Sequence, residues 1–473
     1  MIQIQIIDPS VLAALEAAFP KKPNAVRSNA KLLASYTKKL EQALDEAELR
    51  GNYSLNINLG LYGIYLHDLQ NNTPQMGPKS IRLHAWLEQN GLNLIHKEQE
   101  GQKFGSHKGP SLVKPTARIK ITHVDDRLDP QSAFTKLHPN FHKLSQQEID
   151  TDYDCCEVDV ESVNNFIQPF ANLLAQSIKL NIKDRTVYLQ AKRIAAAASW
   201  KNNIYYQKKK HSDFGRTYYE GLSVQNVRKD LREAMLGDCW EYDIRSSVVA
   251  WKLGFAQDYI NQNNLTGSSI QSIFPQCHQY WIDKSVLINT IRASVFANSH
   301  YSIEKQIGLI KDAMTALNFG ARRSAGMYFD QQGNQCRQAI GEIFKDDVER
   351  DTFLQSQIII DFVAEQKILN DTIINMVKAN QPYVLSYPFL RDKESVFKRL
   401  KLLAYLYQSA ETEVMNIVRS YANTNNLTIL ANVHDAIVLK DQLSPSIKLQ
   451  IDSAIQASNP FWFLKETKYN RTS

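Results

Sequence analysis

Apolar residues recur every three or four positions through most of the chain after residue 190, a pattern that predicts amphipathic helices. The predicted helices of this part span 184–202, 223–236, 302–319, 336–369 and 394–425. Two short strand patterns interrupt them, "WEYDI" at 240–244 and a hairpin at 428–440. Each contains an aspartate at or near a strand end, Asp243 in the first and Asp435 in the second. These two residues are the first candidates for a functional site.

The first 190 residues have a more mixed pattern. They contain helical patterns at 29–49 and 80–90, a loop rich in Gly, Pro and Lys at 101–115, a strand pattern at 117–124 and a turn-rich stretch at 127–143. The change in pattern predicts an N-terminal accessory domain of unidentified role at 1–185 and a second domain at 186–473. Short strands among many helices predict an α+β fold.

The composition is that of a globular protein. The chain has 473 residues, of which 43% are hydrophobic and 22% are charged, so two or three domains with sizeable cores are expected. The five cysteines form no CxxC pair, which favours reduced thiols and no zinc site. The first residues lack the features of a secretory signal, and no apolar run is long enough to span a membrane. We therefore expect a cytoplasmic protein without a membrane partner.

Positive charge is concentrated in one segment. Residues 192–232 contain ten Lys or Arg and three acidic residues, more excess charge than the +6 of the entire chain. Aromatic residues alternate with these cations, namely Trp200, Tyr205, Tyr206, Tyr218 and Tyr219. The combination suits a groove that follows phosphates and stacks on bases. A solvated helix face followed by a basic loop is the alternative interpretation.

The two aspartates suggest metal chemistry. Asp243 ends a strand and precedes a predicted helix, and Asp435 lies at the predicted turn of a hairpin beside His434. Carboxylates on neighbouring strand ends can hold two hard divalent cations, which activate an attacking oxygen and stabilise a leaving pyrophosphate. The sequence therefore predicts a site for two Mg²⁺ ions, with Mn²⁺ as a substitute, held by Asp243 and Asp435.

A helix with a polar face could supply the cation that such chemistry needs. In "KDAMTALNFG", Lys311, Thr315, Asn318 and Phe319 follow the spacing of one helical face. Lys311 would reach the phosphates of a nucleotide, and Phe319 would lie against the nascent base pair. Gly320 would let nucleic acid approach the backbone.

The order of these segments resembles that in a known superfamily. "WEYDIRSSVV" resembles motif A, "KDAMTALNFG" resembles motif B, and "NVHDAIV" resembles motif C of the right-handed polymerases. This superfamily groups the family A DNA polymerases with the single-subunit phage-type RNA polymerases. The resemblance covers residues 213–440. It implies a right-hand fold, with palm, fingers and thumb-like parts around a small antiparallel palm sheet.

The resemblance also implies roles for further residues. His434 would act in catalysis by holding the primer terminus or bracing the turn. "YQSAETEVMNIV" is similar to the helix that contacts the primer–template minor groove, and "DFGRTYYEGLSVQN" is similar to Gly-Arg elements of both polymerase groups. The implied nucleic-acid contacts are Arg216, Tyr218, Gln225, Asn226, Arg228, Gly320 and Gln408.

The chain departs from the motif B pattern at one cation. Family members carry an arginine four residues before the motif B lysine, where this chain has Ile307. Another cation must then assist Lys311 and Thr315 with the triphosphate. Arg322 is one candidate, and Arg292 and Arg323 are others.

The choice between deoxyribonucleotides and ribonucleotides as substrates stays open. DNA polymerases of family A carry a glutamate five residues after the motif A aspartate, where this chain has Val248. Phage-type RNA polymerases carry a small residue there and a tyrosine at the position of Phe319. Val248, in the nucleotide site, lacks the usual steric gate, and Phe319 lacks the hydroxyl group that favours ribonucleotides.

The leading hypothesis is a template-directed nucleotidyltransferase, a DNA polymerase or primase-polymerase, that binds a DNA template and nucleoside triphosphates. Replication of a plasmid, phage or other mobile element is the expected setting. The alternatives are a small phage-type RNA polymerase, an enzyme that adds nucleotides without a template, and a degenerate polymerase fold that only binds nucleic acid. The sequence points to no particular protein partner.

Overall fold

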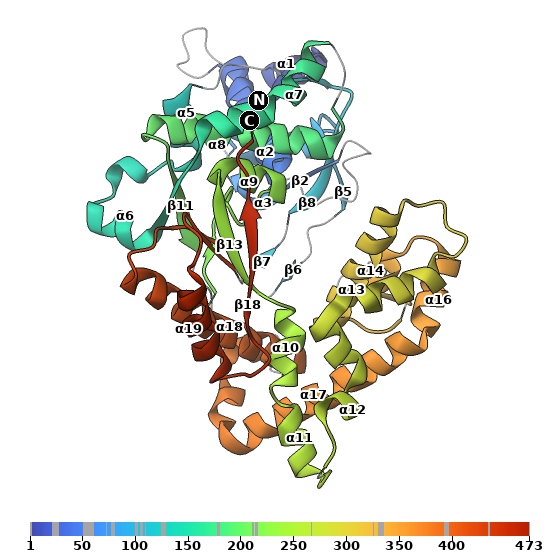
Figure 1. Ribbon diagram of the computed structural model, residues 1–473. Helices are drawn as coiled ribbons and strands as arrows, with labels where there is room; N and C mark the ends of the chain where they lie inside the picture. The colour runs from blue at the N-terminus through green and yellow to red at the C-terminus, as the bar shows by residue number, and fades with distance from the viewer. Residues whose placement is uncertain are drawn as a thin grey trace. The chain divides into compact units, whose positions relative to one another are not determined.

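The computed structural model describes most of the chain. The described residues are 2–20, 28–50, 61–71, 73–76, 81–99, 103–104, 107–108, 110–123, 129–176, 180–210, 212, 216–265, 267–324, 326–329, 335–391, 397–433 and 436–472. The protein belongs to the α+β class, because helices predominate and the strands form small antiparallel sheets (Figure 1). Within the described ranges, no helix has the length and apolar character needed to cross a bilayer.

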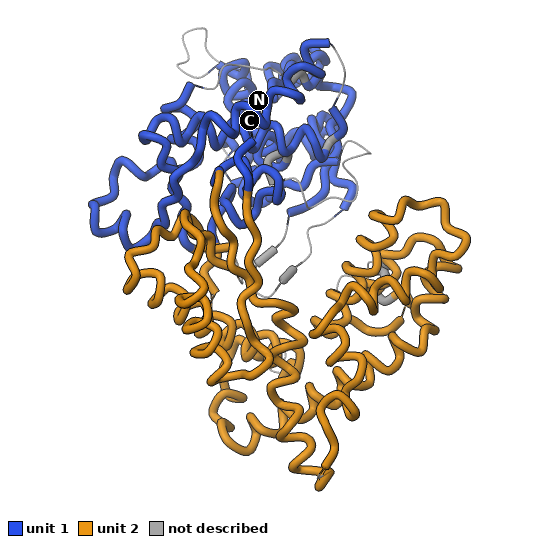
Figure 2. The backbone as a smooth tube through the Cα atoms, viewed as in Figure 1, with its two compact units in different colours: residues 1–209, 219–237, 470–473 blue, residues 210–218, 238–469 orange. Residues whose placement is uncertain are grey.

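The chain divides into two compact units (Figure 2). The first comprises residues 1–209, 219–237 and 470–473, and the second comprises residues 210–218 and 238–469. These units do not follow the boundary expected at residue 185, because helix α8 (Ile182–Trp200) packs against α2, α5 and α7 of the first unit. The last residues of the chain also belong to the first unit.

The first unit combines helices with short strands. Its helices are α1 (Ser10–Ala18), α2 (Asn29–Arg50), α3 (Leu66–Asn71), α4 (Leu83–Gln89), α5 (Pro130–Leu137), η2 (Phe141–Lys143), α6 (Gln146–Asp152), α7 (Val160–Ala175), α8 and α9 (Lys229–Leu236). Its strands are β1 (Ile2–Ile6), β2 (Tyr62–Ile64), β3 (Gln75–Met76), β4 (Ile81–Arg82), β5 (Ile95–Gln99), β6 (Lys103–Phe104), β7 (His107–Lys108), β8 (Ser111–Pro115), β9 (Ile119–His123), β10 (Tyr153–Glu157) and β11 (Ile204–Lys210); β12 (Tyr218–Tyr219) spans the sequence boundary between the units.

Helix α2 forms much of the core of the first unit. Its apolar positions Tyr36, Leu40 and Leu44 are fully buried, and they belong to the same cluster as Ile2 and Ile4 of β1. Their spacing of four residues places them on one face of the helix, as the sequence pattern predicts for 29–49. The first unit therefore has its own hydrophobic core.

The second unit contains the longest helices. They are α10 (Ser247–Leu253), α11 (Ala256–Gln262), α12 (Ile270–Ile273), α13 (Pro275–Val295), α14 (Ile303–Asn318), α15 (Ala339–Ile343), α16 (Asp347–Gln355), α17 (Gln357–Asn380), η3 (Pro382–Ser386), η4 (Pro388–Leu390), α18 (Arg399–Thr424) and α19 (Pro445–Gln456). The strands are β13 (Cys239–Ile244), β14 (Met327–Phe329), β15 (Gln335–Arg337), β16 (Ile429–Val433), β17 (Ala436–Leu439) and β18 (Leu464–Tyr469).

A four-stranded antiparallel sheet organises this unit, with the strand order β16-β17-β13-β18. The predicted strand at 240–244 and the predicted hairpin are both present, as β13 and as β16 with β17. Strand β18, which the sequence pattern does not predict, lies beside β13 (Figure 1). Its sequence, LKETKY, is mostly polar, so pairing with β13 rather than its own pattern makes it a strand.

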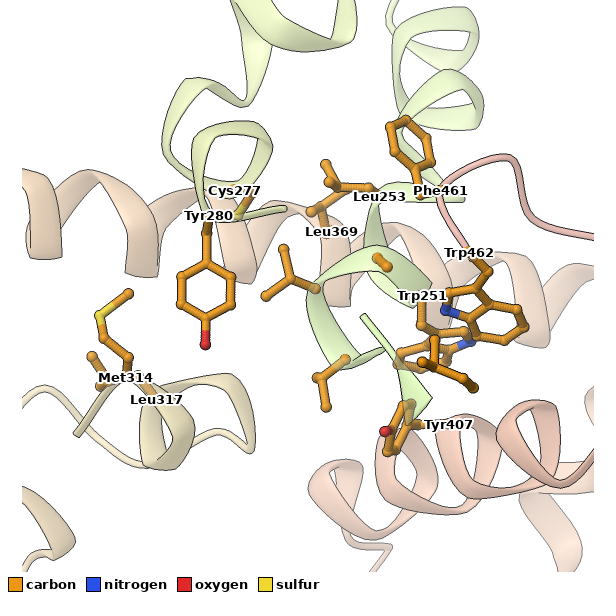
Figure 3. Packing of buried hydrophobic residues seen from close by; sticks show 14 of the residues in the cluster. Trp251, Leu253, Cys277, Tyr280, Met314, Leu317, Leu369, Tyr407, Phe461 and Trp462 are labelled. Atoms are coloured by element: carbon orange, nitrogen blue, oxygen red, sulfur yellow. The ribbon is translucent and has the colours of Figure 1, made fainter. Parts of the chain in front are cut away.

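Alternate residues of the sheet face opposite sides. Tyr242, Ile244, Ile437, Leu439 and Leu464 belong to the large apolar core of the second unit. In Figure 3, Trp251 and Trp462 lie beside one another in this core, with Tyr407 close to them and Tyr280 and Met314 on its other side. The residues that alternate with the first set along β13 and β18 therefore belong to the opposite face of the sheet.

The helix predicted over 336–369 is interrupted. Strand β15 occupies its beginning, and α15, α16 and α17 follow as separate helices. The break before α16 arises because the side chain of Asp346 accepts a hydrogen bond from the backbone N–H of Glu349 and caps a new helix. Ser356, with φ of −57° and ψ of 125°, separates α16 from α17.

Candidate functional site

Asp243 lies near the end of β13, in the middle of the four-stranded sheet. On one side its register partner is Ala436 of β17, and on the other it is Lys465 of β18. Directly opposed residues on neighbouring strands share a face, with Cβ atoms about 4.5–5.5 Å apart. Asp243 and Lys465 therefore share the face opposite the apolar core, and the carboxylate is only partly buried.

The second predicted carboxylate, Asp435, and its neighbour His434 lie outside the described residues. The residues that flank them in sequence, Val433 and Ala436, are paired with each other across the β16–β17 hairpin. Ala436 is in turn the partner of Asp243. The hairpin register therefore brings the residue that follows Asp435 in the sequence directly beside Asp243.

The turn after Asp243 has an unusual backbone. Ser246 has φ of +48° and ψ of 40°, a left-handed conformation that costs free energy for a residue with a side chain. Helix α10 begins immediately afterwards at Ser247, whose hydroxyl group accepts a hydrogen bond from Tyr407 (2.8 Å). Val248, at the position of the expected steric gate, is 8% exposed. Tertiary contacts from α18 thus hold the start of α10 next to Asp243.

Helix α14 presents the predicted polar face with one exception. Lys311, Thr315 and Phe319 are exposed, and Phe319 is 52% exposed. Asn318, predicted on the same face, is instead buried at 7% exposure. Its backbone carbonyl accepts a hydrogen bond from the buried amine of Lys252 (2.9 Å), because the last turn of α14 packs onto α10.

Gly320 follows this helix with φ of +87°, a conformation that favours glycine. A Cβ atom at this position would come within 2.6 Å of Leu400 Cδ2. The side chain of Leu400 in α18 therefore lies against the backbone of Gly320. The contact between nucleic acid and Gly320 stays a prediction.

Arg216 is held by helix α18. Its guanidinium group donates two hydrogen bonds to the carboxylate of Glu411, one of them from Nε at 2.7 Å, and lies 5.6 Å above the ring of Tyr407. Glu411 has a 1% exposed side chain. Burial opposes the charge of Arg216, but the bonds to Glu411 raise its pKa above the ordinary value. The charge of Arg216 is therefore satisfied within the protein.

The neighbouring residues extend this network. The hydroxyl group of Tyr218 donates a hydrogen bond to Gln408 Oε1 at 3.5 Å. Tyr407 packs edge-on against Phe319, with ring centroids 6.1 Å apart. The structure thus brings together the predicted residues Arg216, Tyr218, Gln408 and Phe319 through α18.

A cluster of cations near Asp243 was not anticipated by the sequence patterns. Partial burial and the positive charges of Lys465, Lys311 and Arg245 lower the pKa of Lys284, whereas the charge of Asp243 raises it. We call Lys284, Lys311, Lys465 and Arg245 the cation cluster. It combines residues of α13, α14 and β18 with the residue that follows β13, so only the folded chain reveals it.

A kink in α13 determines where Lys284 lies. Asp283 leaves the helical region with φ of −152° and ψ of 90°. Its carboxylate accepts a hydrogen bond from the backbone N–H of Ser285 (2.9 Å), which begins the helix again. Arg245 donates a hydrogen bond to the carbonyl of Ile282, just before the kink. This contact ties the kink to the end of β13.

The arginines proposed to assist with a triphosphate have other positions. Arg292 donates hydrogen bonds to Asn289 and to Gln306. Arg323 donates one to the carbonyl of Leu354 (2.6 Å). Arg322 is exposed, and none of the three is among the charges that act on Lys284.

Three predicted nucleic-acid contacts belong to the first unit. Gln225 is 6% exposed, and Asn226 donates a hydrogen bond to the carbonyl of Gly221 (2.7 Å). Arg228 forms ion pairs with Asp184 and Asp230. Burial leaves Gln225 unable to reach a ligand in this conformation, whereas Asn226 and Arg228 keep exposed side chains.

The basic segment at 192–232 is largely compensated within the protein. Ion pairs to carboxylates involve Arg193, Lys208, Lys209, Arg216, Arg228 and Lys229. Tyr205 and Tyr219 are buried, so they are not available as stacking platforms for bases. Tyr206 packs edge-on against Phe141, with ring centroids 4.8 Å apart. Most of the aromatic alternation therefore serves packing, although Trp200 is 46% exposed.

Comparisons with known proteins add no assignment: no protein-family model matches the chain, and neither does any curated protein sequence. Among the described residues, no group of three or more His, Cys, Asp or Glu side chains is arranged to hold a metal ion. The candidate site is therefore defined by its own geometry. Asp243 lies at its centre, and the cation cluster lies near Asp243. The residues that α18 holds together, Arg216, Tyr218, Gln408 and Phe319, complete it.

Proposed function

We propose that the second unit is the catalytic core of a template-directed nucleotidyltransferase that acts on DNA by a two-metal mechanism. The observation that carries the proposal is the pairing of Asp243 with Ala436, the residue after Asp435. This register is what two cooperating carboxylates on neighbouring strand ends require. The sheet of β13, β16, β17 and β18 would be the palm of a right-hand fold, and α13 to α17 would belong to the fingers.

The donor chemistry suits Mg²⁺. Carboxylate oxygens are the ligands that this ion prefers, and Asp243 is partly exposed on the face of the sheet opposite the apolar core. Asp243 and Asp435 would hold the ions, which when bound activate the attacking hydroxyl and stabilise the leaving pyrophosphate. Asp243 is rigidly placed because its strand pairs with neighbours on both sides.

The remaining residues would bind and orient the substrates. Lys311 would contact the triphosphate, and Phe319, exposed at the end of α14, would lie against the new base pair. Tyr407 supports the ring of Phe319 edge-on, which favours one orientation. The Arg216–Glu411 pair is better suited to holding the 216–218 segment on α18 than to contacting phosphate directly. Gln408 and Tyr218 would face the nucleic acid.

Primer extension on a labelled DNA template tests the proposal. The protein with Mg²⁺ is given dNTPs and NTPs in parallel reactions, and Asp243→Asn and Asp435→Asn are assayed alongside. Asp441→Asn is the matched control, because Asp441 is an exposed carboxylate that follows β17 at the opposite end of the strand from Asp435.

We expect template-dependent extension that both site variants abolish and the control retains. Asp435→Asn should keep the fold and the affinity for DNA. The productive nucleotide set would decide between a DNA polymerase and a small RNA polymerase, and extension that ignores the template would indicate end addition. Tight DNA binding without incorporation would instead support a binding protein with a degenerate polymerase fold, and the proposal would fail.

A further inference from the structure

The cation cluster concentrates like charges without matching carboxylates. Its members are Lys284, Lys311, Lys465 and Arg245. Lys465 lies opposite Asp243 in the β13–β18 register, and Arg245 is bonded to the carbonyl of Ile282, two residues before Lys284. Among the carboxylates, Asp243 acts on Lys284, and Asp283 lies near Arg245. Asp283 is already engaged by the N–H and hydroxyl groups of Ser285. The described cluster thus carries an excess of positive charge.

This arrangement differs from the other cation-rich parts of the protein. Arg216, Lys208 and Arg228 each form an ion pair with a carboxylate. Within the described part of the chain, no ion pair between a carboxylate and any member of the cation cluster is found. Like charges held together cost free energy unless an anion joins them. The cluster is therefore arranged for a multivalent anion.

Three separate features of the fold maintain the cluster. The β13–β18 register fixes Lys465 opposite Asp243. The kink at Asp283 places Lys284 at the start of the second half of α13. Arg245 is fixed by its bond to the carbonyl of Ile282 and by stacking on Phe463, with its guanidinium carbon 5.3 Å from the ring centroid. The backbone positions of these cations are thus set before any ligand binds.

We infer that Lys284 and Lys465, together with Arg245 and Lys311, form a polyphosphate site that binds the triphosphate of the incoming nucleotide beside Asp243. The inference rests on the proposed function and assigns the cation that is missing at Ile307. Lys284 approaches from α13 and Lys465 from the sheet, so the phosphate chain would be held from two sides. Neither lysine belongs to the three motifs, and Arg292, Arg322 and Arg323 are not needed for this role.

A nucleotide triphosphate suits the cluster better than a nucleic-acid backbone. Four cations held close together match several negative charges on adjacent phosphates, whereas a backbone presents one charge per nucleotide. The position of Asp243 inside the cluster also matters, because a bare carboxylate repels phosphate unless a metal ion lies between them. Magnesium-bound polyphosphate meets both conditions.

Calorimetric binding of inorganic tripolyphosphate with Mg²⁺ tests the inference without requiring catalysis. The proteins compared are the wild type, Lys284→Ala, Lys465→Ala and the control Lys378→Ala, whose lysine is exposed in the last turn of α17. Losing one charge-assisted contact should raise the Kd about tenfold or more in the two site variants, with the control unchanged. Lys284→Arg should retain most of the affinity, and thermal unfolding shows whether each variant is folded.

Unchanged affinity in folded Lys284→Ala and Lys465→Ala would overturn the inference, as would a wild type that does not bind tripolyphosphate. Weakened binding of a DNA duplex with tripolyphosphate binding intact would assign the cluster to a backbone and also overturn it. Primer extension by the same proteins separates this result from the proposed function. If the lysine variants weaken tripolyphosphate binding but the wild type does not extend primers, the polyphosphate site stands and the polymerase proposal fails. If the wild type extends primers but the lysine variants bind tripolyphosphate as the wild type does, the polymerase proposal stands and the polyphosphate site fails.

Discussion

Lys252 is a lysine of α10 that lies in the core of the second unit with 3% of its surface exposed. Its amine donates hydrogen bonds to the backbone carbonyl of Asn318 and to the side-chain carbonyl of Gln366, both uncharged. Burial lowers its pKa from the usual 10.5 to about 8. The neighbouring thiol of Cys277 opposes this only weakly, since burial raises the pKa of that thiol well above its ordinary value.

The lowered pKa predicts a specific dependence of stability on pH. Between about pH 8 and pH 10.5 the unfolded chain binds a proton at this lysine and the folded chain does not, so the free energy of unfolding rises with pH across this window. The full difference corresponds to about 3 kcal/mol, at about 1.4 kcal/mol for each factor of ten. From about pH 7 to about pH 9.5 the gain attributable to Lys252 is about 2 kcal/mol.

Urea unfolding of the wild type and of Lys252→Met isolates this contribution. Fluorescence suits the measurement, because four of the six tryptophans, Trp240, Trp251, Trp281 and Trp462, belong to the second unit. Methionine keeps the apolar length of the side chain but leaves two acceptors without their donor, so the difference at one pH is not informative. The informative quantity is how the difference between the two proteins changes with pH.

We expect the free energy of unfolding of the wild type to rise by about 2 kcal/mol more than that of Lys252→Met between about pH 7 and about pH 9.5. Lys378→Met, which changes an exposed lysine of α17, should follow the wild type at both pH values. If the wild type and Lys252→Met change in parallel, Lys252 titrates normally in the folded protein. Its role as a buried link between α10 and the end of α14 would then be wrong.

Two further predictions concern the site. Lys311→Ala should raise the nucleotide KM about tenfold and leave DNA affinity unchanged, because an exposed lysine of α14 would contact only the triphosphate; titration of nucleotide in the extension assay measures this, and an unchanged KM would refute the phosphate role. Arg216→Ala should destabilise the second unit by about 3–5 kcal/mol, because it leaves the buried carboxylate of Glu411 unpaired. In the double variant Arg216→Ala/Glu411→Gln most of this loss should be recovered, and equal urea midpoints for the single and double variants would contradict that explanation.

The local sequence was enough to predict those helices and strands whose own residues show a clear apolar pattern. The spacing of apolar residues predicted helices at 29–49 and 302–319, which the structure has as α2 and α14. The short strand pattern WEYDI at 240–244 predicted β13, and the two apolar runs at 428–440 predicted the β16–β17 hairpin. These predictions succeed because periodicity is a property of neighbouring residues and survives in any fold that buries one face.

Tertiary structure decided what lies beside these elements. Strand β18 is polar and carries no apolar pattern, yet its pairing with β13 places Lys465 opposite Asp243. The kink at Asp283, which gives Lys284 its position, depends on contacts from a distant strand end and on a local side-chain cap. The burial of Asn318 and the binding of Arg216 by Glu411 likewise depend on contacts with helices 66 and 195 residues away.

The physical reason is the range of the interactions. Helix and strand propensities act over a few residues, and so the sequence alone determined the order of the strands and helices that carry Asp243, Lys311 and the His434–Asp435 pair. Register, ion pairing and burial join segments that are far apart in the chain, and their free energies exist only once the core has formed. The cations that surround Asp243 were therefore decided by the tertiary structure.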